Sequence, residues 1–248
     1  SDGARFDSFG LSVSIDDDTV VIGAPRDDNE LGSVYIFIQT NGVWYEQAKL
    51  TANDGTSGDM FGQSVSIDGD TVVIGAPSDE YNGNYSGSAY VYLRNNGVWS
   101  EEQKLTASDG ATEDAFGYNV SIDDDTIVIG AYGDDTSSGS AYIFIRSNGL
   151  WSQQAKLTAS DGASDDQFGW SVSIDGDTAV IGSRWPGSAY VYVRNNGVWS
   201  EQQVLTFSGS ISSVSIDGNT IVVGKWGSAY VYLRNNGVWS EQQVLTFS

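Results

Sequence analysis

Alternating apolar and polar positions recur along this chain in short segments that turn residues separate. In one stretch the segments are Ser64–Asp68, Thr71–Ala76, Gly87–Arg94 and Val98–Thr106. Their apolar positions hold β-branched and aromatic residues, which predicts four strands. The links Asp68-Gly69-Asp70 and Asn95-Asn96-Gly97 are short and made of residues that tolerate a positive φ, so each predicts a tight hairpin. No segment has the 3.6-residue period of an amphipathic helix.

This four-strand pattern occurs five times. The tripeptide Val-Ser-Ile marks each copy, and a tryptophan after an Asn-Gly turn marks it again; the tripeptides begin 42 to 55 residues apart, at Val13, Val65, Val120, Val172 and Val214. Four antiparallel strands repeated at this period are typical of propeller blades. We therefore predict an all-β fold, a β-propeller of five four-stranded antiparallel blades in a single domain, 1–248. The repeats are approximately 1–53, 54–108, 109–160, 161–208 and 209–248.

The phase of the repeat bears on whether the blades form a ring. The chain begins with the segment that follows the fourth strand in other copies, and it ends on a fourth strand. We expect the two ends to meet and close a ring of five blades. The alternative is a piece of a longer array, such as a seven-bladed ring, and a start at Ser1 without Met indicates a mature chain or an excised segment.

One stretch of sequence is duplicated without change. The segment Arg194–Ser208 recurs as Arg234–Ser248. Such identity indicates a recent duplication or an engineered, consensus-like sequence, and it keeps open a role as a structural or assembly unit.

Charge and composition exclude several classes of function. The chain has 11 Lys and Arg against 33 Asp and Glu, a formal net charge of −22. Nucleic acid and anionic membrane surfaces are therefore poor partners, because phosphates need basic residues to displace their counterions. No apolar run approaches the roughly 18 residues of a membrane span. The absence of His and Cys removes the commonest general base and any thiol nucleophile.

A Phe-Gly dipeptide and a later Gly-Ala-Pro tripeptide carry a family resemblance. Phe61-Gly62 is followed by Gly75-Ala76-Pro77, and Phe9-Gly10 by Gly23-Ala24-Pro25, while later copies keep degraded forms. The chain resembles the FG-GAP-repeat propellers, in their bacterial form more than in the integrin α-subunit form. The resemblance implies an extracellular or cell-surface module for adhesion or ligand binding, with a glycan or an extracellular protein as partner. The integrin-type calcium loop is missing, because the link at Asp68–Asp70 is too short to supply six to eight oxygen ligands.

Acidic residues gather on one predicted face. The links between strands two and three and between blades hold the long loops, and we call their side the long-loop face. One interpretation is a ring of cation sites, with calcium as the candidate ion and no other cofactor indicated. The other is that the Asp of each Asp-Gly pair caps a turn by bonding its own backbone, and that the remaining acids are solvated charge. The acids in question are Asp27, Asp28, Asp54, Asp59, Asp79, Asp109, Asp114, Asp134 and Asp135.

The fourth and fifth copies differ on the same face. Their shortened loops place a basic residue beside a tryptophan, and a further tryptophan follows Phe168-Gly169. We predict a ligand patch there, because exposed tryptophans are amphipathic platforms for sugars and peptide side chains. The alternative is that the tryptophans fill space left by the short loops. The patch comprises Trp170, Arg184, Trp185, Lys225 and Trp226.

These features favour a non-catalytic binding or adhesion module. An assembly unit without a small ligand, able to self-assemble, is the first alternative. A glycoside-active propeller is the second, but it needs two carboxylates set apart from the rest, and here the acids repeat from copy to copy. We therefore expect no enzymatic activity.

Overall fold

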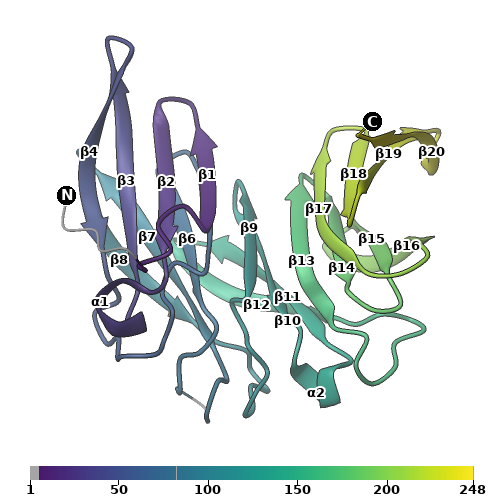
Figure 1. Cartoon of the computed structure of the whole chain (residues 1–248), viewed down its shortest axis with the longest axis horizontal. Helices are drawn as coiled ribbons and strands as arrows, with labels where there is room; N and C mark the ends of the chain where they lie inside the picture. Colours follow the sequence, from purple (N-terminus) through teal and green to yellow (C-terminus); the bar gives the residue numbers. More distant parts are fainter. Residues whose placement is uncertain (1–5, 82, 248) are drawn as a thin grey trace.

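The computed structural model describes residues 6–81 and 83–247, which form five four-stranded sheets. In each sheet the strands lie in chain order and every neighbouring pair is antiparallel, as Figure 1 shows. The predicted class, an all-β propeller of five four-stranded antiparallel blades, is confirmed.

In the first four blades the strands are joined by a tight turn, a longer loop and a second tight turn, whereas all three links of the fifth blade are two-residue turns. The first blade has β1 (Ser12–Asp16), β2 (Thr19–Ala24), β3 (Ser33–Thr40) and β4 (Val43–Leu50). The second has β5 (Ser64–Asp68), β6 (Thr71–Ala76), β7 (Ser88–Asn95) and β8 (Val98–Leu105). The third has β9 (Asn119–Asp123), β10 (Thr126–Ala131), β11 (Ser140–Ser147) and β12 (Leu150–Leu157). The fourth has β13 (Phe168–Asp175), β14 (Thr178–Ser183), β15 (Ser188–Asn195) and β16 (Val198–Thr206). The fifth has β17 (Ile211–Asp217), β18 (Thr220–Lys225), β19 (Ser228–Asn235) and β20 (Val238–Thr246).

Two short helical turns interrupt this all-β pattern. They are α1 (Asp27–Glu30) and α2 (Asp134–Ser137), in the β2–β3 and β10–β11 loops. Both contain residues in the left-handed region, such as Asp28 with a φ of 49° and Asp135 with a φ of 48°. Turns of four residues are too short to leave a helical period in the sequence, which is why the pattern did not indicate them.

The apolar core lies between the blades. The described residues form four hydrophobic clusters, and each joins two consecutive blades. The repeated tryptophan belongs to these clusters in four blades, where Trp99, Trp151, Trp199 and Trp239 are buried. The ring of Phe61 contacts both Tyr90 and Tyr92 edge to face. The sequence repeat is therefore a repeat of one interface.

Glycine sets how closely two blades approach. A Cβ on Gly75 of β6 would lie 1.9 Å from the carbonyl oxygen of Gly117, which belongs to the Phe-Gly pair of the third blade. The same carbonyl oxygen accepts a hydrogen bond of 2.9 Å from the Ser64 hydroxyl. A side chain at Gly75 would therefore push the next blade away, and the motif glycines exist to let two backbones touch.

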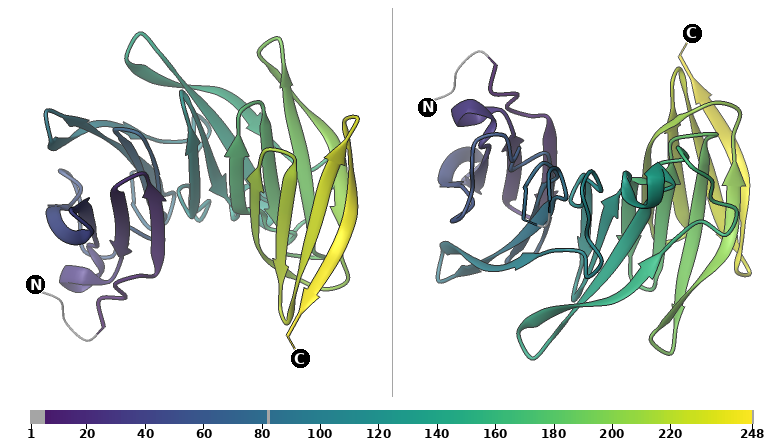
Figure 2. Two further views of the ribbon diagram at one scale, coloured as in Figure 1. Left: turned by 90° about the horizontal axis from the view of Figure 1, so that it is seen from above. Right: turned by 90° about the horizontal axis from the view of Figure 1, so that it is seen from below.

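The five blades do not close into a ring. The first and last blades lie at opposite ends of the molecule (Figures 1 and 2). No hydrophobic cluster of the described residues joins them, and Ile15 of the first blade is 65% exposed where its counterpart Ile67 is 6% exposed. The expectation of ring closure is therefore wrong for this structure, because a matching phase at the two ends does not fix the angle between blades.

Replacing Gly75 with alanine should lower the free energy of unfolding by about 2–3 kcal/mol, as overpacking between rigid backbones does. Gly224 holds the same position in the fifth blade, where the nearest atom to an added Cβ is the side-chain oxygen of Ser213. Gly224→Ala should therefore change stability by less than about 1 kcal/mol. Urea unfolding of both variants measures the difference, and equal effects would contradict the role of close blade contact.

Candidate functional site

The long-loop face carries a cluster of opposite charges in the second blade. The Lys104 ammonium lies 2.7 Å from a carboxylate oxygen of Asp54 and 2.7 Å from one of Asp79. The Tyr90 hydroxyl donates to the same two carboxylates, at 2.9 Å and 2.7 Å. Asp54 lies in the loop between β4 and β5 and Asp79 in the loop between β6 and β7. The lysine comes from β8 and the tyrosine from β7. One lysine thus holds both loops to the blade.

The neighbouring blades repeat this cluster. In the third blade the Lys156 ammonium lies 2.7 Å from Asp109 and 2.6 Å from Asp134, with Asp135 at 3.4 Å. In the first blade Lys49 pairs with Asp27 at 2.7 Å and reaches Asp28 at 3.8 Å. The fourth blade keeps the bond from Tyr190 to Asp161 but has Val204 at the position of the lysine.

These contacts bring together most of the acids that we considered as calcium ligands, but around a lysine. In the part of the chain that the structure describes, no three acidic side chains gather in a way that could hold a metal ion. Asp59 and Asp114 serve their own loops instead. The amide of Thr56 donates to the Asp59 carboxylate at 2.6 Å, and the amide of Ala111 donates to that of Asp114 at 2.6 Å, so each caps its own turn rather than serving as solvated charge.

The lysines also set the protonation of the acids. Burial alone would raise the pKa of the Asp54 carboxyl, but the Lys104 ammonium and the Tyr90 hydroxyl outweigh it and hold that pKa below its usual range. Asp109 has a lowered pKa for the same reasons, against burial and through Lys156 and Tyr142. Burial opposes the charge on Lys104 as well, yet the two carboxylates raise its pKa. Asp54, Asp109 and Lys104 are therefore charged at neutral pH.

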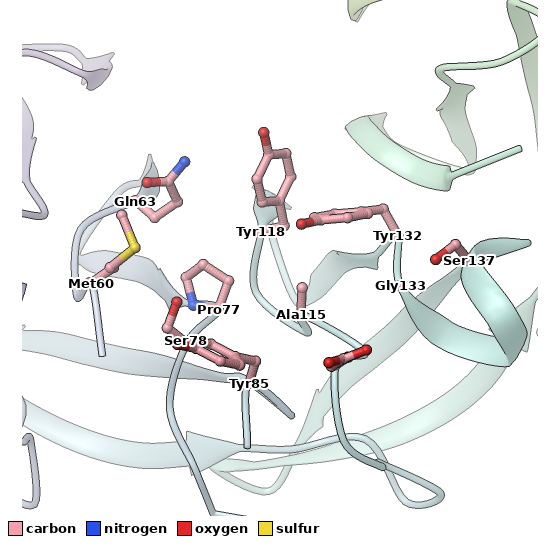
Figure 3. A pocket seen from close by; sticks show the side chains of 11 residues that line it. Met60, Gln63, Pro77, Ser78, Tyr85, Ala115, Tyr118, Tyr132, Gly133 and Ser137 are labelled. Carbon is pink, nitrogen blue, oxygen red and sulfur yellow. The ribbon is translucent and has the colours of Figure 1, made fainter. Parts of the chain in front are cut away.

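A cleft of about 440 Å³ opens between the second and third blades on this face. Figure 3 shows Met60 and Gln63 on the side of the second blade and Tyr132 on the side of the third, with Tyr118 between them. Pro77, Ser78 and Tyr85 line it too, and Glu113, Ala115, Gly133 and Ser137 complete the wall. The lining thus combines three tyrosines, Met60, Pro77 and Ala115 with four polar side chains, those of Gln63, Ser78, Glu113 and Ser137.

Aromatic rings continue from the cleft to the fourth blade. The ring of Tyr118 lies 4.6 Å from that of Tyr132 and 4.6 Å from that of Trp170, between centroids. The Arg184 guanidinium lies 4.2 Å from the centroid of the Trp170 ring. Burial, with the neighbouring Tyr132, raises the pKa of the Tyr118 hydroxyl to about 12 although Arg184 opposes this. We call Tyr118, Tyr132, Trp170 and Arg184 the aromatic rim.

The structure divides the ligand patch that the sequence predicts. Trp170 and Arg184 meet in the aromatic rim, whereas Trp185 is 49% exposed and Trp226 is 97% exposed. The Lys225 ammonium lies over the rings of Phe207 and Tyr230, at 5.9 Å and 5.4 Å from their centroids, and donates to the carbonyl oxygen of Ser208. Because its side chain is almost fully exposed, Trp226 does not fill space left by the short loop, as the alternative interpretation requires.

The repeats on which this face is built have counterparts in known proteins. The sequence profile of the FG-GAP repeat matches residues 1–37, 44–92, 99–144 and 151–192. The chain belongs to the FG-GAP repeat family. The fifth blade lies outside these matches, in accord with its loss of both motif dipeptides except Gly224.

Two proteins show how far the likeness extends. Integrin alpha-6 of Gallus gallus is 31% identical over 126 residues, which is 46% of this chain and 12% of the integrin. The match therefore spans about an eighth of that relative's length. A crystal structure of a Lactobacillus plantarum protein superposes with a TM-score of 0.68 at 12% identity, over 96% of this chain and 71% of the other. This second likeness concerns the fold alone. Among the described residues, no helix has the length and apolar character to cross a membrane.

Sequence reasoning missed the cleft, although a signal for it exists. The residues that directly follow the two FG-GAP dipeptides in the third blade are Tyr118 and Tyr132, and the same positions in the second blade hold Gln63 and Pro77. The fourth blade has Trp170 and Arg184 there. These positions lie together at the rim of each blade, so aromatic residues at both of them in one blade indicate an aromatic cleft.

Replacing Lys104 with methionine should lower the free energy of unfolding by about 2–3 kcal/mol at pH 7, because the largely buried Asp79 loses its ammonium partner. Because the pKa of Asp54 is lower in the folded chain than in the unfolded chain, this carboxylate contributes stability above its unfolded pKa. That contribution is lost as the pH falls through its folded pKa. Because the pKa of Lys104 is higher in the folded chain, this ammonium contributes stability at every pH below the unfolded pKa of the lysine. The deficit of the variant should thus be largest between about pH 4 and pH 10.

Val204→Met at the matching position of the fourth blade is the control, and it should change stability little at any pH. Urea unfolding across the pH range checks both variants. A deficit of Lys104→Met that does not shrink below about pH 4 would contradict the charge cluster as its cause.

Trp226→Ala should leave stability within about 0.5 kcal/mol of the wild type, because the side chain is 97% exposed. Trp239→Ala in the same blade should cost about 3–5 kcal/mol, because that ring is 2% exposed between blades. Thermal unfolding of the pair separates surface tryptophan from core tryptophan, and a large loss in Trp226→Ala would restore the packing interpretation.

Proposed function

We propose that this chain is a non-catalytic, extracellular binding module of the adhesion type that holds a protein ligand on its long-loop face. Membership of the FG-GAP repeat family and the likeness to integrin alpha-6 support an adhesion-like propeller. The observation that carries the proposed site is the cleft between the second and third blades, which opens beside the aromatic rim.

The lining of the cleft suits an apolar or aromatic side chain of a protein loop. Its volume of about 440 Å³ is within the usual range for a pocket that encloses a ligand group. Tyr85 is 55% exposed at its edge, and rigid aromatic rings supply contact area at low cost in conformational entropy. Tyr118 keeps its proton at physiological pH, so its hydroxyl remains available as a hydrogen-bond donor.

Negative charge around the cleft favours a ligand that carries a basic residue next to the apolar side chain. Glu113 lines the cleft and is exposed, and Asp135 nearby in α2 keeps 69% of its side chain exposed although Lys156 contacts it. With a net charge of −22 behind them, these carboxylates attract a ligand that carries Lys or Arg. The ligand that fits is thus an apolar anchor next to a basic residue.

The engaged carboxylates of the long-loop face support a binding role over an enzymatic one. The buried carboxylates Asp79 and Asp134 are each engaged by a lysine and a tyrosine hydroxyl, so they serve to hold loops. Catalysis of glycoside hydrolysis needs one acid free to give a proton and another free to act as base or nucleophile.

Panning a phage-displayed random peptide library on the immobilised chain tests the proposal. We expect enriched peptides with an aromatic or large apolar residue beside Lys or Arg. Tyr132→Ala should weaken a selected synthetic peptide at least about tenfold, the scale of one truncated anchor contact. Tyr45→Ala, on the exposed fourth strand of the first blade, is the control and should bind like the wild type.

Two results would contradict this proposal. One is equal binding of the peptides by the wild type and Tyr132→Ala, with both variants shown to be folded by thermal unfolding. The other is a glycan array that yields a ligand lost in Tyr132→Ala while no peptide is enriched, which would replace the protein ligand with a glycan.

A further inference from the structure

The first blade exposes the surface that every other blade buries. Val13 and Ile15 of β1 are each 65% exposed, whereas the valines and isoleucines at these positions in the other four blades are 5–7% exposed. Trp44 is 40% exposed, and its four counterparts are 2–9% exposed. Phe9 and Leu11 extend this apolar surface, with 54% and 56% exposed. In the other blades this surface packs on the preceding blade.

The fifth blade exposes the opposite surface. Leu245 is 46% exposed, whereas Leu50, Leu105, Leu157 and Leu205 at the same position are 2–6% exposed. Val222 and Val231 are half-buried, where Val180 and Val191 of the fourth blade are fully buried. In the first four blades these positions pack on the blade that follows. The two ends of the chain thus carry the two halves of one interface.

Polar groups at the internal interfaces show how the two halves align. The amide of Ile67 donates to the Ser14 hydroxyl at 3.2 Å, and the amide of Gly69 donates to the Asp16 carboxylate at 2.7 Å. The next three interfaces repeat both bonds. The acceptors come from the earlier blade and the donors from the later one. This polar ladder fixes the register between blades.

The end blades carry both sides of this ladder. Ser215 and Asp217 of the fifth blade hold the acceptor positions, and the amides of Ile15 and Asp17 in the first blade hold the donor positions. At an internal interface the Trp99 indole donates to the Gln47 amide oxygen at 2.9 Å. Trp44 and Gln242 hold the corresponding positions at the two ends.

We propose that the first blade of one copy docks on the fifth blade of a second copy, through a head-to-tail interface like those inside the chain. A second copy fits because its first blade presents the apolar residues, amide donors and tryptophan that a following blade presents at each internal interface. Such a contact is heterologous, so each copy keeps one free end and copies can add in series. This inference does not rest on the proposed ligand site, which lies on the long-loop face.

Charge predicts how this association depends on salt. Each copy carries a net charge of −22, so two copies repel over the screening distance. Raising the salt concentration from about 0.1 M to about 1 M shortens that distance from about 10 Å to about 3 Å. Self-association through an apolar surface should therefore strengthen as salt is added.

Two variants and their mixture test the proposal by sedimentation velocity at high salt. Ile15→Asp damages the first-blade surface and Leu245→Asp the fifth-blade surface, so each alone should associate at least about a hundredfold more weakly than the wild type, which forms dimers and larger species. Mixed in equal amounts, they should form a 1:1 dimer that grows no further, because one intact half remains on each. Val98→Asp, on an internal blade and equally exposed, should associate like the wild type.

Several outcomes would overturn the proposal. A wild type that stays monomeric at every soluble concentration and salt would show that no second copy binds. Wild-type association that both single variants keep would place the contact on another surface. A mixture that stays monomeric while the wild type associates would exclude the head-to-tail pairing, and far-UV circular dichroism of each variant excludes unfolding as the cause.

Discussion

The close backbone contact between consecutive blades is the constraint on which the rest of the structure depends. In the first three blades a glycine on the second strand, which is Gly23, Gly75 or Gly130, faces the Phe-Gly carbonyl of the next blade, and a Cβ there would overlap that carbonyl. Once the backbones touch, the apolar residues of both blades interlock and the amide ladder falls into register. The long loops emerge at heights and angles that this contact dictates, so it also places the cleft beside Tyr118.

Most of the loop acids discussed above on the long-loop face have a structural role, because a lysine holds them to their blade. In each of the first three blades one lysine holds two or three of the loop acids, and the fourth blade replaces that lysine by valine together with its shortened loop. The lysine therefore belongs with the long loop as a unit. A lysine ammonium can hold two or three carboxylates, whereas calcium needs six to eight oxygen ligands. Unlike calcium, the lysine cannot be removed by a chelator.

Much of the fold follows from the sequence because period-two alternation and turn residues act locally. The strands Ser64–Asp68 and Thr71–Ala76 are predicted to the residue, and the next two within one. The angle between blades is a property of packing between segments distant in the chain, and for this reason the phase of the repeat misled us about closure. The site shows the same division. Trp170 and Arg184 stand out by residue type, whereas the cleft at Tyr132 depends on two positions that meet only in space. The acid pairs were visible, but the lysine that joins them comes from a different strand.

The free outer surfaces of the end blades give the array a property that closed rings lack. Among the described residues, each hydrophobic cluster joins a blade to its neighbour in the chain, so these contacts do not depend on a fixed total number of blades. A gene for such an array can lengthen or shorten by one copy while every remaining contact stays as it was. The identical segments Arg194–Ser208 and Arg234–Ser248 are consistent with a recent step of that kind. Blade number is thus a quantity that selection can adjust one unit at a time.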